Sequence, residues 1–262
     1  MQTKDVQGRL WSAAPADWVR YIEPTFIPMY QAVLGKLQLN EETMLLDAGC
    51  GSGLFMNMAR RTGATVTGID AAPGLLDVAR KRLPETTLLI EDLEALPFGE
   101  ETFDVVTGFN SFQYAGSFEN ALSEAARVAK RSGKLVIGIW GKEADCESSP
   151  LLKAVVSLLP PPPPGTPGPF ALSEEGKVEA ICNNVGLKVI YKQEVLCPWQ
   201  FIGLDELHDA FLCTAPCVKA VHAVGEAKVK QALSEAARPF DLADHIYYMR
   251  NYFTFFILER TH

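Results

Sequence analysis

Short apolar runs alternate with amphipathic stretches between about residues 43 and 140. Five runs of four to seven residues predict strands: Met44–Asp47, Thr65–Ile69, Thr87–Ile90, Val105–Phe109 and Leu135–Trp140. Helix-like stretches lie between them, at Leu54–Arg61, Gly74–Leu83 and Phe118–Lys130. Because the strands are continuously apolar rather than alternating, they indicate a parallel sheet buried on both faces. The pattern predicts a doubly wound α/β core that binds its ligand beyond the carboxyl ends of the strands.

The flanking segments differ from this core. Residues 1–40 carry several aromatic side chains and predict one or two helices interrupted at Pro24 and Pro28. These helices either pack on the sheet or form a flap over the ligand, and the sequence leaves both possibilities open. The run Leu159–Gly165 predicts a stiff polyproline loop beside the site.

The C-terminal part predicts a return to the core after a helical insertion. A helix is expected from Ser173 to about Asn184, with Gly186 as its C-terminal cap and a strand at Gly186–Tyr191. Residues 204–237 are helix-rich, and Asn251–Leu258 predicts a closing strand. We therefore expect seven strands in a core made of residues 41–195 and 247–262, an N-terminal helical flap at 1–40, and a helical lid at 196–246.

A glycine triplet follows the first predicted strand and marks the candidate site. Gly49, Gly51 and Gly53 occupy every second position, and Asp47 precedes them. Glycine can take positive φ and lets a ligand lie against bare backbone. The spacing is G-x-G-x-G rather than the G-x-G-x-x-G of dinucleotide-binding proteins, and no P-loop lysine follows it. An acid at this strand end suits a ligand with an ammonium group rather than a phosphate.

Two further acids stand at the ends of the next two predicted strands. Asp70 lies 23 residues after Asp47, close to the distance at which a carboxylate meets an adenosine ribose in α/β folds. Asp70 could equally cap the following helix. Asp92 could accept a hydrogen bond from an exocyclic amine, and Leu93 could lie on a purine face. Acids at three successive strand ends fit an adenosine that carries an amino acid.

In combination, these motifs resemble the S-adenosylmethionine (AdoMet) methyltransferases of the ubiquinone/menaquinone-biosynthesis type. The match covers Leu45 to Trp140, including Leu45–Gly53, Gly68–Ala71, Asp92–Phe98 and Phe103–Val106. The resemblance implies a Rossmann-like methyltransferase fold, a seven-stranded mostly parallel sheet, and AdoMet as cofactor, with S-adenosylhomocysteine (AdoHcy) as product. It further implies cofactor contacts from Asp47, the backbone of Gly49, Gly51 and Gly53, Asp70, Asp92 and Leu93. We also expect contacts from Cys50, Ala71, Asn110 and, if the N-terminal helices form a flap, Trp18.

The expected activity is in-line transfer of the sulfonium methyl group to a small molecule, because such a methyl is already a strong electrophile. Many relatives carry a histidine where Gln113 or Tyr114 stands here, which weakens the case for a histidine base. Candidate catalytic residues are Tyr114, Gln113 and, from the insertion, His208. A non-catalytic AdoMet-binding regulator and transfer of another AdoMet-derived group are the alternatives. The candidates to line the acceptor pocket are Phe112, Gln113, Tyr114, Trp140, Trp199, Phe201 and Phe211, and core packing would explain such residues equally well.

Composition narrows the partners. The net charge is −8 and the basic residues are scattered, so nucleic-acid binding is disfavoured. No apolar run approaches the roughly 18 residues that span a membrane, and no apolar signal core is present, so we expect a cytoplasmic protein without a membrane partner. Its expected oligomeric state is a monomer or a homodimer. The four residues His208, Cys213, Cys217 and His222 could bind zinc, but their helix-like spacing favours buried thiols, and no metal is expected.

Overall fold

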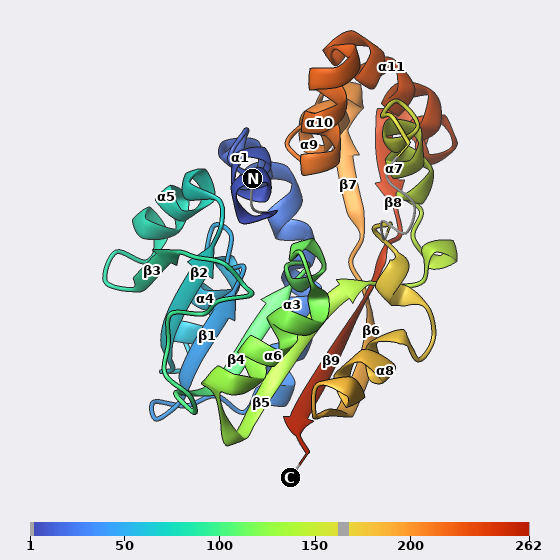
Figure 1. Ribbon diagram of the computed structural model, residues 1–262. Helices are drawn as coiled ribbons and strands as arrows, with labels where there is room; N and C mark the ends of the chain where they lie inside the picture. Colours follow the sequence, from blue (N-terminus) through green and yellow to red (C-terminus); the bar gives the residue numbers. More distant parts are fainter. Residues whose placement is uncertain (1–2, 162–167, 262) are drawn as a thin grey trace.

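The computed structural model describes residues 3–161 and 168–261, and its centre is a seven-stranded sheet (Figure 1). Its strands are, in spatial order, β3 (Thr87–Ile90), β2 (Thr65–Asp70), β1 (Met44–Ala48), β4 (Phe103–Phe109), β5 (Ala129–Trp140), β9 (Tyr252–Arg260) and β6 (Leu187–Leu196). The first five are parallel, and β9 runs antiparallel to both its neighbours. The predicted fold class and strand number are confirmed.

Two strands extend five or six residues beyond their predicted bounds. β5 begins at Ala129, because the preceding helix ends at Val128 rather than continuing to Lys130. β6 continues to Leu196, five residues past the predicted end. Its second half begins with the polar run Lys192–Glu194, and half-buried residues alternate with exposed ones along most of the strand, as is typical of an edge strand with one face open to water. The search for continuous apolar runs therefore missed it.

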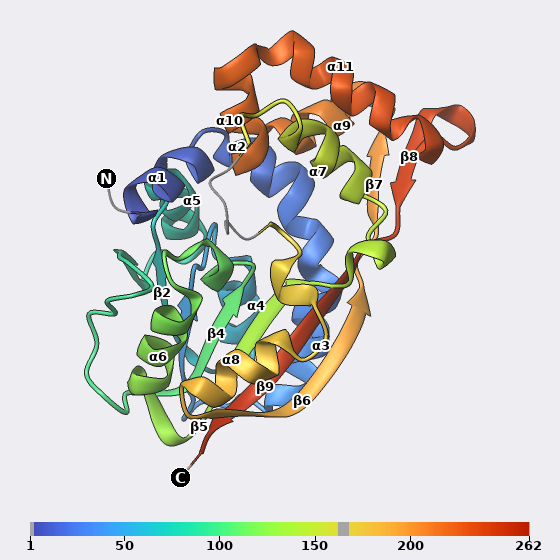
Figure 2. The same cartoon turned by 45° about the vertical axis from the view of Figure 1, so that its right-hand side comes forward.

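Helices cover both faces of the sheet, as the apolar strands require. Leu45 and Leu46 on β1 are both fully buried and belong to opposite apolar layers. One layer is closed by α3 (Ile27–Leu37), α4 (Leu54–Arg60) and α5 (Pro73–Arg82), and the other by α6 (Phe118–Val128) and α8 (Lys177–Asn184) (Figures 1 and 2). This two-sided burial positions the ends of β1, β2 and β4 at one edge.

The N-terminal segment crosses that edge as a chain of short helical pieces. They are α1 (Thr3–Trp11), α2 (Pro15–Asp17), the π-helical turn η1 (Trp18–Ile22) and the 3₁₀ turn η2 (Glu23–Phe26), which lead into α3. Pro24 lies in the 3₁₀ turn, as its helix-breaking ring suggests. The expected interruption at Pro28 was wrong, because Pro28 lies in the first turn of α3, where a missing N–H costs nothing.

A second unit stands above the carboxyl edge of the parallel strands (Figure 1). It contains β7 (Trp199–Ile202), α9 (Gly203–Leu212), α10 (Ala215–Val224), α11 (Glu226–Ala237) and β8 (Ile246–Met249). Helix α7 (Ser149–Val156) packs against α10 and α11. The antiparallel pair β7–β8 was not predicted, because its strands lie at the two ends of the segment that was expected to form a helical lid.

The connection before α8 differs from the prediction. Ser173 does not begin that helix; it ends the 3₁₀ turn η5 (Ala171–Ser173), and α8 begins after Gly176, whose φ is +75°. The remaining short turns are η3 (Phe112–Tyr114), η4 (Glu143–Asp145), η6 (Arg238–Phe240) and η7 (Ala243–His245). Pro162–Gly165 of the polyproline run lie outside the described residues.

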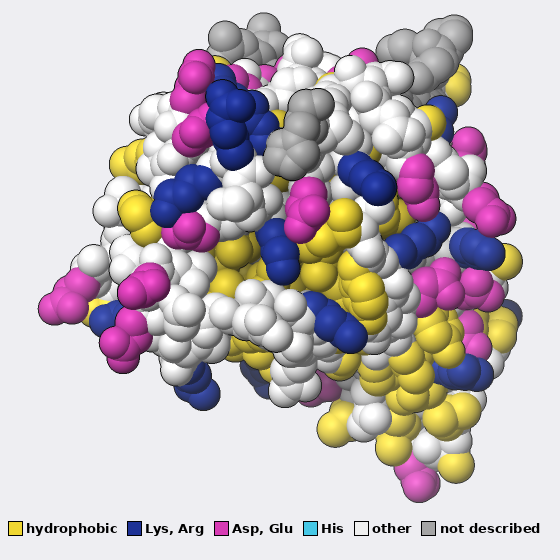
Figure 3. Space-filling model, turned by 90° about the horizontal axis from the view of Figure 1, so that it is seen from below, with side chains coloured by type: hydrophobic (Ala, Val, Ile, Leu, Met, Phe, Trp, Pro, Cys, Tyr) yellow, Lys and Arg dark blue, Asp and Glu magenta, His cyan; other side chains and the backbone are white. Residues whose placement is uncertain are grey.

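The face opposite the carboxyl edge carries interspersed acidic and basic side chains with apolar side chains between them (Figure 3). Among the helices described at residues 3–161 and 168–261, none combines the length and the hydropathy needed to cross a bilayer.

Candidate functional site

The glycine loop after β1 is held in a conformation that only glycine adopts easily. Gly49, Gly51 and Gly53 have φ values of +85°, +54° and +79°. The N–H groups of Gly49 and Cys50 donate to the carbonyl of Ile69 on β2 at 2.8 and 2.9 Å. The strand-to-helix turn predicted from the triplet is therefore present, and it opens directly into α4.

Asp70 binds this loop from the end of β2. Its Oδ2 accepts a hydrogen bond from the Gly51 N–H at 2.7 Å, and its Oδ1 accepts one from the Ala72 N–H at 2.8 Å. Burial raises the pKa of Asp70, and these backbone donors oppose the shift. The carboxylate thus links the glycine loop to the start of α5 while retaining lone pairs for further donors. Ala71 follows Asp70 directly, in the short link between β2 and α5.

Asp47 is buried at the end of β1 beside Thr107 of β4. Only 2% of its surface is exposed, and its Oδ1 accepts a hydrogen bond from the Thr107 hydroxyl at 2.7 Å. Burial raises its pKa to about 7, the Thr107 hydrogen bond opposes the shift, and the charge of Asp70 adds to it. No basic side chain in the described part of the chain forms an ion pair with it. A bound cation at this place would favour the ionised form.

The structure places the remaining predicted cofactor residues at the ends of β3 and β4. Asp92 follows β3, and its Oδ1 accepts from the Glu94 N–H at 3.0 Å, while Leu93 is partly buried against the apolar layer. Asn110 follows β4 with φ of +48°, and its N–H donates to the Gly138 carbonyl at 2.8 Å. These positions agree with a site along one edge, and the ligand contacts themselves stay a prediction.

Gln113 and Tyr114 lie in the turn after β4. Gln113 Nε2 donates to Asn110 Oδ1 at 3.2 Å, and Gln113 Oε1 is buried with no hydrogen-bond partner among the described residues. Burial raises the pKa of Tyr114 to about 12, against the effect of Gln113. Tyr114 is therefore neutral near pH 7 and is a poor base.

Aromatic rings of the N-terminal segment lie over this turn. Trp11 packs edge-on against Tyr114 with ring centroids 5.5 Å apart, and Trp18 packs against Trp11 at 5.2 Å. Residues 3–26 therefore lie beside the carboxyl end of β4, as the flap hypothesis requires. Whether Trp18 contacts the cofactor stays a prediction.

Sequence reasoning missed Tyr30. Its ring lies 5.4 Å from Phe55 and 4.9 Å from Phe109, between α4 and the end of β4. Burial and the charges of Asp47 and Glu23 raise the pKa of Tyr30 well above its usual value. The phenol therefore lies near the acids of the glycine loop. Nothing in the spacing of the motifs indicates that α3 would bring it there.

The structure gives His208 a packing role. Its Nε2 lies 2.8 Å from the Ser234 Oγ, between α9 and α11, and burial lowers its pKa. A role of His208 as a base stays a prediction. Among residues 3–161 and 168–261, no group of three or more His, Cys, Asp or Glu side chains is arranged to hold a metal ion. Cys213 and Cys217 are buried thiols.

The predicted aromatic lining divides between two layers. Trp140 contacts Phe253 with centroids 4.5 Å apart, and Trp199 and Phe211 join the same cluster. Phe201 also belongs to this layer. Phe112 was wrongly grouped with them, because its ring packs in the opposite layer against Phe118 of α6.

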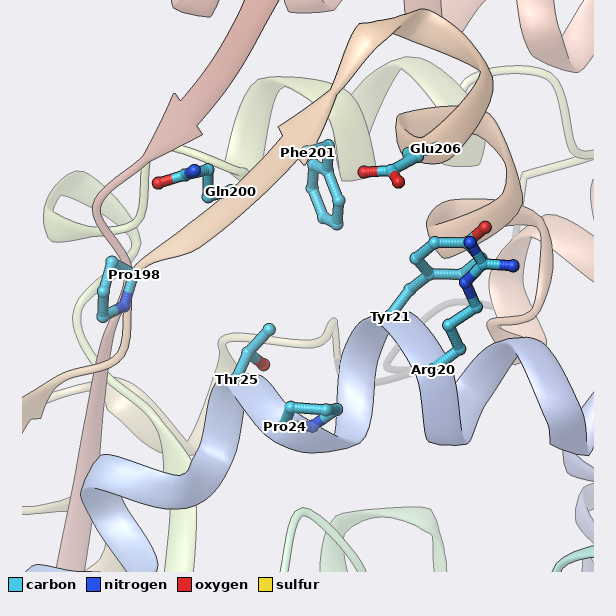
Figure 4. Close-up of a pocket in the computed structure, with 8 residues that line it drawn as sticks. All are labelled: Arg20, Tyr21, Pro24, Thr25, Pro198, Gln200, Phe201 and Glu206. Atoms are coloured by element: carbon cyan, nitrogen blue, oxygen red, sulfur yellow. The ribbon is translucent and has the colours of Figure 1, made fainter.

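An open groove of about 380 Å³ lies on the outer side of the N-terminal segment (Figure 4). Arg20, Tyr21, Pro24 and Thr25 form one wall, and the other comes from β7 and the start of α9, including Gln200 and Glu206. The Arg20 guanidinium lies 4.9 Å from the Tyr21 ring centroid. The inner side of the same segment faces the glycine loop, so residues 18–26 separate the groove from the candidate cofactor site.

The fold and the glycine loop are those expected of the SAM-dependent methyltransferases, where SAM is AdoMet. Residues 46–137 match the family model described as a methyltransferase domain. The chain therefore carries a methyltransferase domain, and the resemblance expected from its motifs is confirmed.

Named relatives agree with this assignment over a comparable length of chain. Malonyl-[acyl-carrier protein] O-methyltransferase of Serratia marcescens is 36% identical over 40% of this chain and 42% of its own length. Demethylmenaquinone methyltransferase of Tropheryma whipplei is 36% identical over 36% of this chain and 40% of its own length. The matches thus span less than half the length of these relatives.

A solved structure extends the likeness of fold. A SAM-dependent methyltransferase from Geobacter sulfurreducens, in complex with AdoHcy, superposes with a TM-score of 0.57. It is 17% identical, and the superposition covers 90% of this chain and 92% of that one. This confirms the fold outside the matched domain.

Gly51 provides a modest test of the loop. A Cβ there would meet only the Leu75 Cδ1, at 3.9 Å, so Gly51→Ala leaves the packing intact. An alanine held at this positive φ lowers the folding stability by about 1 kcal/mol. We expect AdoHcy affinity to fall about 10-fold, because the methyl group lies where a ligand would meet the backbone. Calorimetric titration and thermal unfolding measure the two effects, and Gly176→Ala, with φ of +75° in an open turn, is the matched control. Equal AdoHcy affinity in both variants would contradict this placement.

Proposed function

We propose that the protein transfers the methyl group of AdoMet to a small-molecule acceptor. The observation that carries the proposal is the linkage of Asp70 to Gly51 beside the buried Asp47, at one edge of a methyltransferase domain. Its relatives are named for methylation of malonyl-[acyl-carrier protein] and demethylmenaquinone. Because those matches cover only part of each chain, the acceptor is a matter for experiment.

The residues present fit AdoMet. The open space around Gly51 leaves room for the methionine portion against the backbone. Asp47 offers an acid without a cationic partner among the described residues, which suits the ammonium group. Asp70 has lone pairs left for ribose hydroxyls, and Asp92 with Leu93 would hold the adenine at the end of β3.

Positioning and exclusion of water are the protein's main contributions. Bound AdoMet supplies an electrophilic methyl group. The aromatic rings of Trp11 and Trp18, above the turn after β4, would shield the reacting atoms from water. The insertion at 196–246 would act as the lid over the acceptor. In-line alignment of donor and acceptor then provides most of the rate enhancement.

The proposed activity is tested with AdoMet and a panel of phenols, carboxylic acids, amines and quinols. The expected result is AdoHcy formation with at least one class and calorimetric binding of AdoHcy without an acceptor. Binding of AdoHcy with no product from any class would favour the regulatory alternative. An adduct of mass other than one methyl group would favour transfer of another AdoMet-derived group. Absence of AdoHcy binding would refute the proposal.

Tyr114 tests whether a general base is needed. Because its pKa is about 12, Tyr114→Phe is expected to change kcat by less than about 5-fold. The measurement is initial rate against pH from 6 to 9, with Tyr252→Phe on β9 as the control. A 100-fold loss of kcat in Tyr114→Phe would instead assign the phenol a catalytic role.

A further inference from the structure

The N-terminal segment is joined to the glycine loop by a buried polar network of Glu23, Ser52 and Arg82. Arg82 Nη1 and Nη2 donate to the two carboxylate oxygens of Glu23 at 2.9 and 2.8 Å, and Nη1 also donates to the Ser52 carbonyl at 2.8 Å. The Ser52 hydroxyl donates to Glu23 Oε1. Three segments, η2, the glycine loop and the end of α5, therefore meet in one set of hydrogen bonds.

The network is withdrawn from water. Glu23 is 4% exposed and Ser52 is 1% exposed, while the Arg82 side chain retains 20%. A forked guanidinium–carboxylate contact in this setting is strong and sharply oriented. Removing one partner would leave a buried charge unpaired, which is costly. The contact therefore forms only when η2 and the glycine loop hold their observed positions relative to each other.

The position of Ser52 gives the network its significance. Ser52 lies between Gly51 and Gly53, so the network holds the loop from one side while Asp70 holds Gly51 from the other. Bare backbone of this loop is what the proposed function places against the methionine portion of AdoMet. A shift of Ser52 would therefore move the binding surface itself.

The segment that carries Glu23 has irregular helical geometry. It consists of the π-helical turn η1 and the 3₁₀ turn η2, forms that are unstable in isolation and frequent at functional sites. Ile22 and Phe26 flank Glu23 and are 1% and 5% exposed. The inner face of this segment is therefore held by the polar contact of Glu23 and by the buried apolar side chains of Ile22 and Phe26.

We propose that Glu23 and Arg82 are positioning residues that couple docking of residues 18–26 to AdoMet binding. The inference rests on the proposed function. By linkage, a ligand that stabilises the loop stabilises the docked segment, and the docked segment raises ligand affinity by the same factor. The Trp18 ring would then cover the site only when the loop is in its binding conformation.

The test uses the full chain and AdoHcy as the probe. Arg82→Gln is expected to weaken AdoHcy binding about 10-fold by calorimetry. Arg82→Lys, which keeps a charge opposite Glu23 but not the fork that reaches Ser52, is expected to lose about 3-fold. Arg80→Gln on the same helix is the matched control, because Arg80 is exposed and pairs with Asp77. It should bind as the wild type does.

Hydrogen exchange separates coupling from simple destabilisation. In the wild type, AdoHcy should slow amide exchange in residues 18–26; in Arg82→Gln that slowing should be largely lost while strands β1 and β4 stay protected. Ser52→Ala, which removes only the hydroxyl donor to Glu23, gives the same readout if Arg82→Gln does not fold. Wild-type affinity and wild-type slowing in a folded Arg82→Gln or Ser52→Ala protein would overturn the coupling. Failure of the wild type to bind AdoHcy would overturn the proposed function instead.

Discussion

Replacing Asp47 by asparagine is expected to make the ligand-free protein more stable at pH 8 and to abolish tight AdoHcy binding. Burial raises the folded-state pKa of Asp47 from 3.8 to about 7. Folding therefore favours the protonated form, and the associated stability is full below the unfolded pKa and is lost as pH rises toward 7. Asparagine resembles the protonated acid and can still accept the Thr107 hydrogen bond, so it avoids that loss.

The expected size of this effect follows from the shift. A pKa unit corresponds to about 1.36 kcal/mol, so the rise from 3.8 to about 7 gives a gain on the order of 4 kcal/mol at pH 8, and the gain vanishes near pH 4. Urea unfolding at pH 4.5 and pH 8 measures it. Asp104→Asn is the control, because Asp104 pairs with Lys130 at the opposite end of β4, and its pKa is lowered. That variant should lose stability at pH 8 and keep its AdoHcy affinity.

The same substitution is expected to weaken AdoHcy binding although it raises the stability of the ligand-free protein. An ammonium group beside Asp47 favours the carboxylate, so AdoHcy binding to the wild type near pH 6 should release a proton from this residue. Calorimetry in buffers of different ionisation enthalpy detects that release. In Asp47→Asn, AdoHcy binding should release no proton, and its affinity should be more than 100-fold weaker than that of the wild type. Unchanged affinity in Asp47→Asn would refute the role of Asp47 as the ammonium partner.

Asp70→Asn is expected to reduce AdoHcy affinity by about 100-fold. The amide group has one acceptor oxygen in place of two, so it cannot serve Gly51, Ala72 and a ribose hydroxyl together. A hydrogen bond to a charged group contributes about 1.5–3 kcal/mol, which corresponds to a loss of this order. Asp77→Asn, an exposed acid on α5, is the control and should bind AdoHcy normally.

A ligand analogue separates ribose recognition from loop support. AdoHcy lacking both ribose hydroxyls should bind the wild type weakly and should bind Asp70→Asn no more weakly than AdoHcy itself does. If the analogue binds both proteins more weakly than AdoHcy by the same factor, Asp70 does not contact the ribose and acts only by holding Gly51. Calorimetry of the four combinations gives the coupling directly.

The predictable parts of the site share a simple physical basis. Asp47, Gly51 and Asp70 stand at the ends of continuous apolar strands, and parallel strands with both faces buried bring their carboxyl ends to one edge. The glycine spacing and the acids that follow each strand were therefore sufficient to predict this edge as the binding site and AdoMet as its ligand. The fold class and the methyltransferase domain follow from the same local pattern.

The missed parts depend on contacts between distant segments. Glu23 and Arg82 are 59 residues apart, and neither belongs to a recognisable motif. Tyr30 lies beside Phe55 and Phe109 only because α3 packs across the strand ends, and the β7–β8 pair forms between the two ends of the expected lid. The contact between His208 and Ser234 is likewise a product of helix packing.

Local chemistry thus decides the glycine turn, the buried strands and the acids, because each depends on a few neighbouring residues and on the period of the chain. The pKa of Asp47, the orphaned oxygen of Gln113 and the network at Ser52 arise only when segments far apart exclude water together. Burial and pairing across that distance are properties of the packed molecule, and they set the electrostatics of the site.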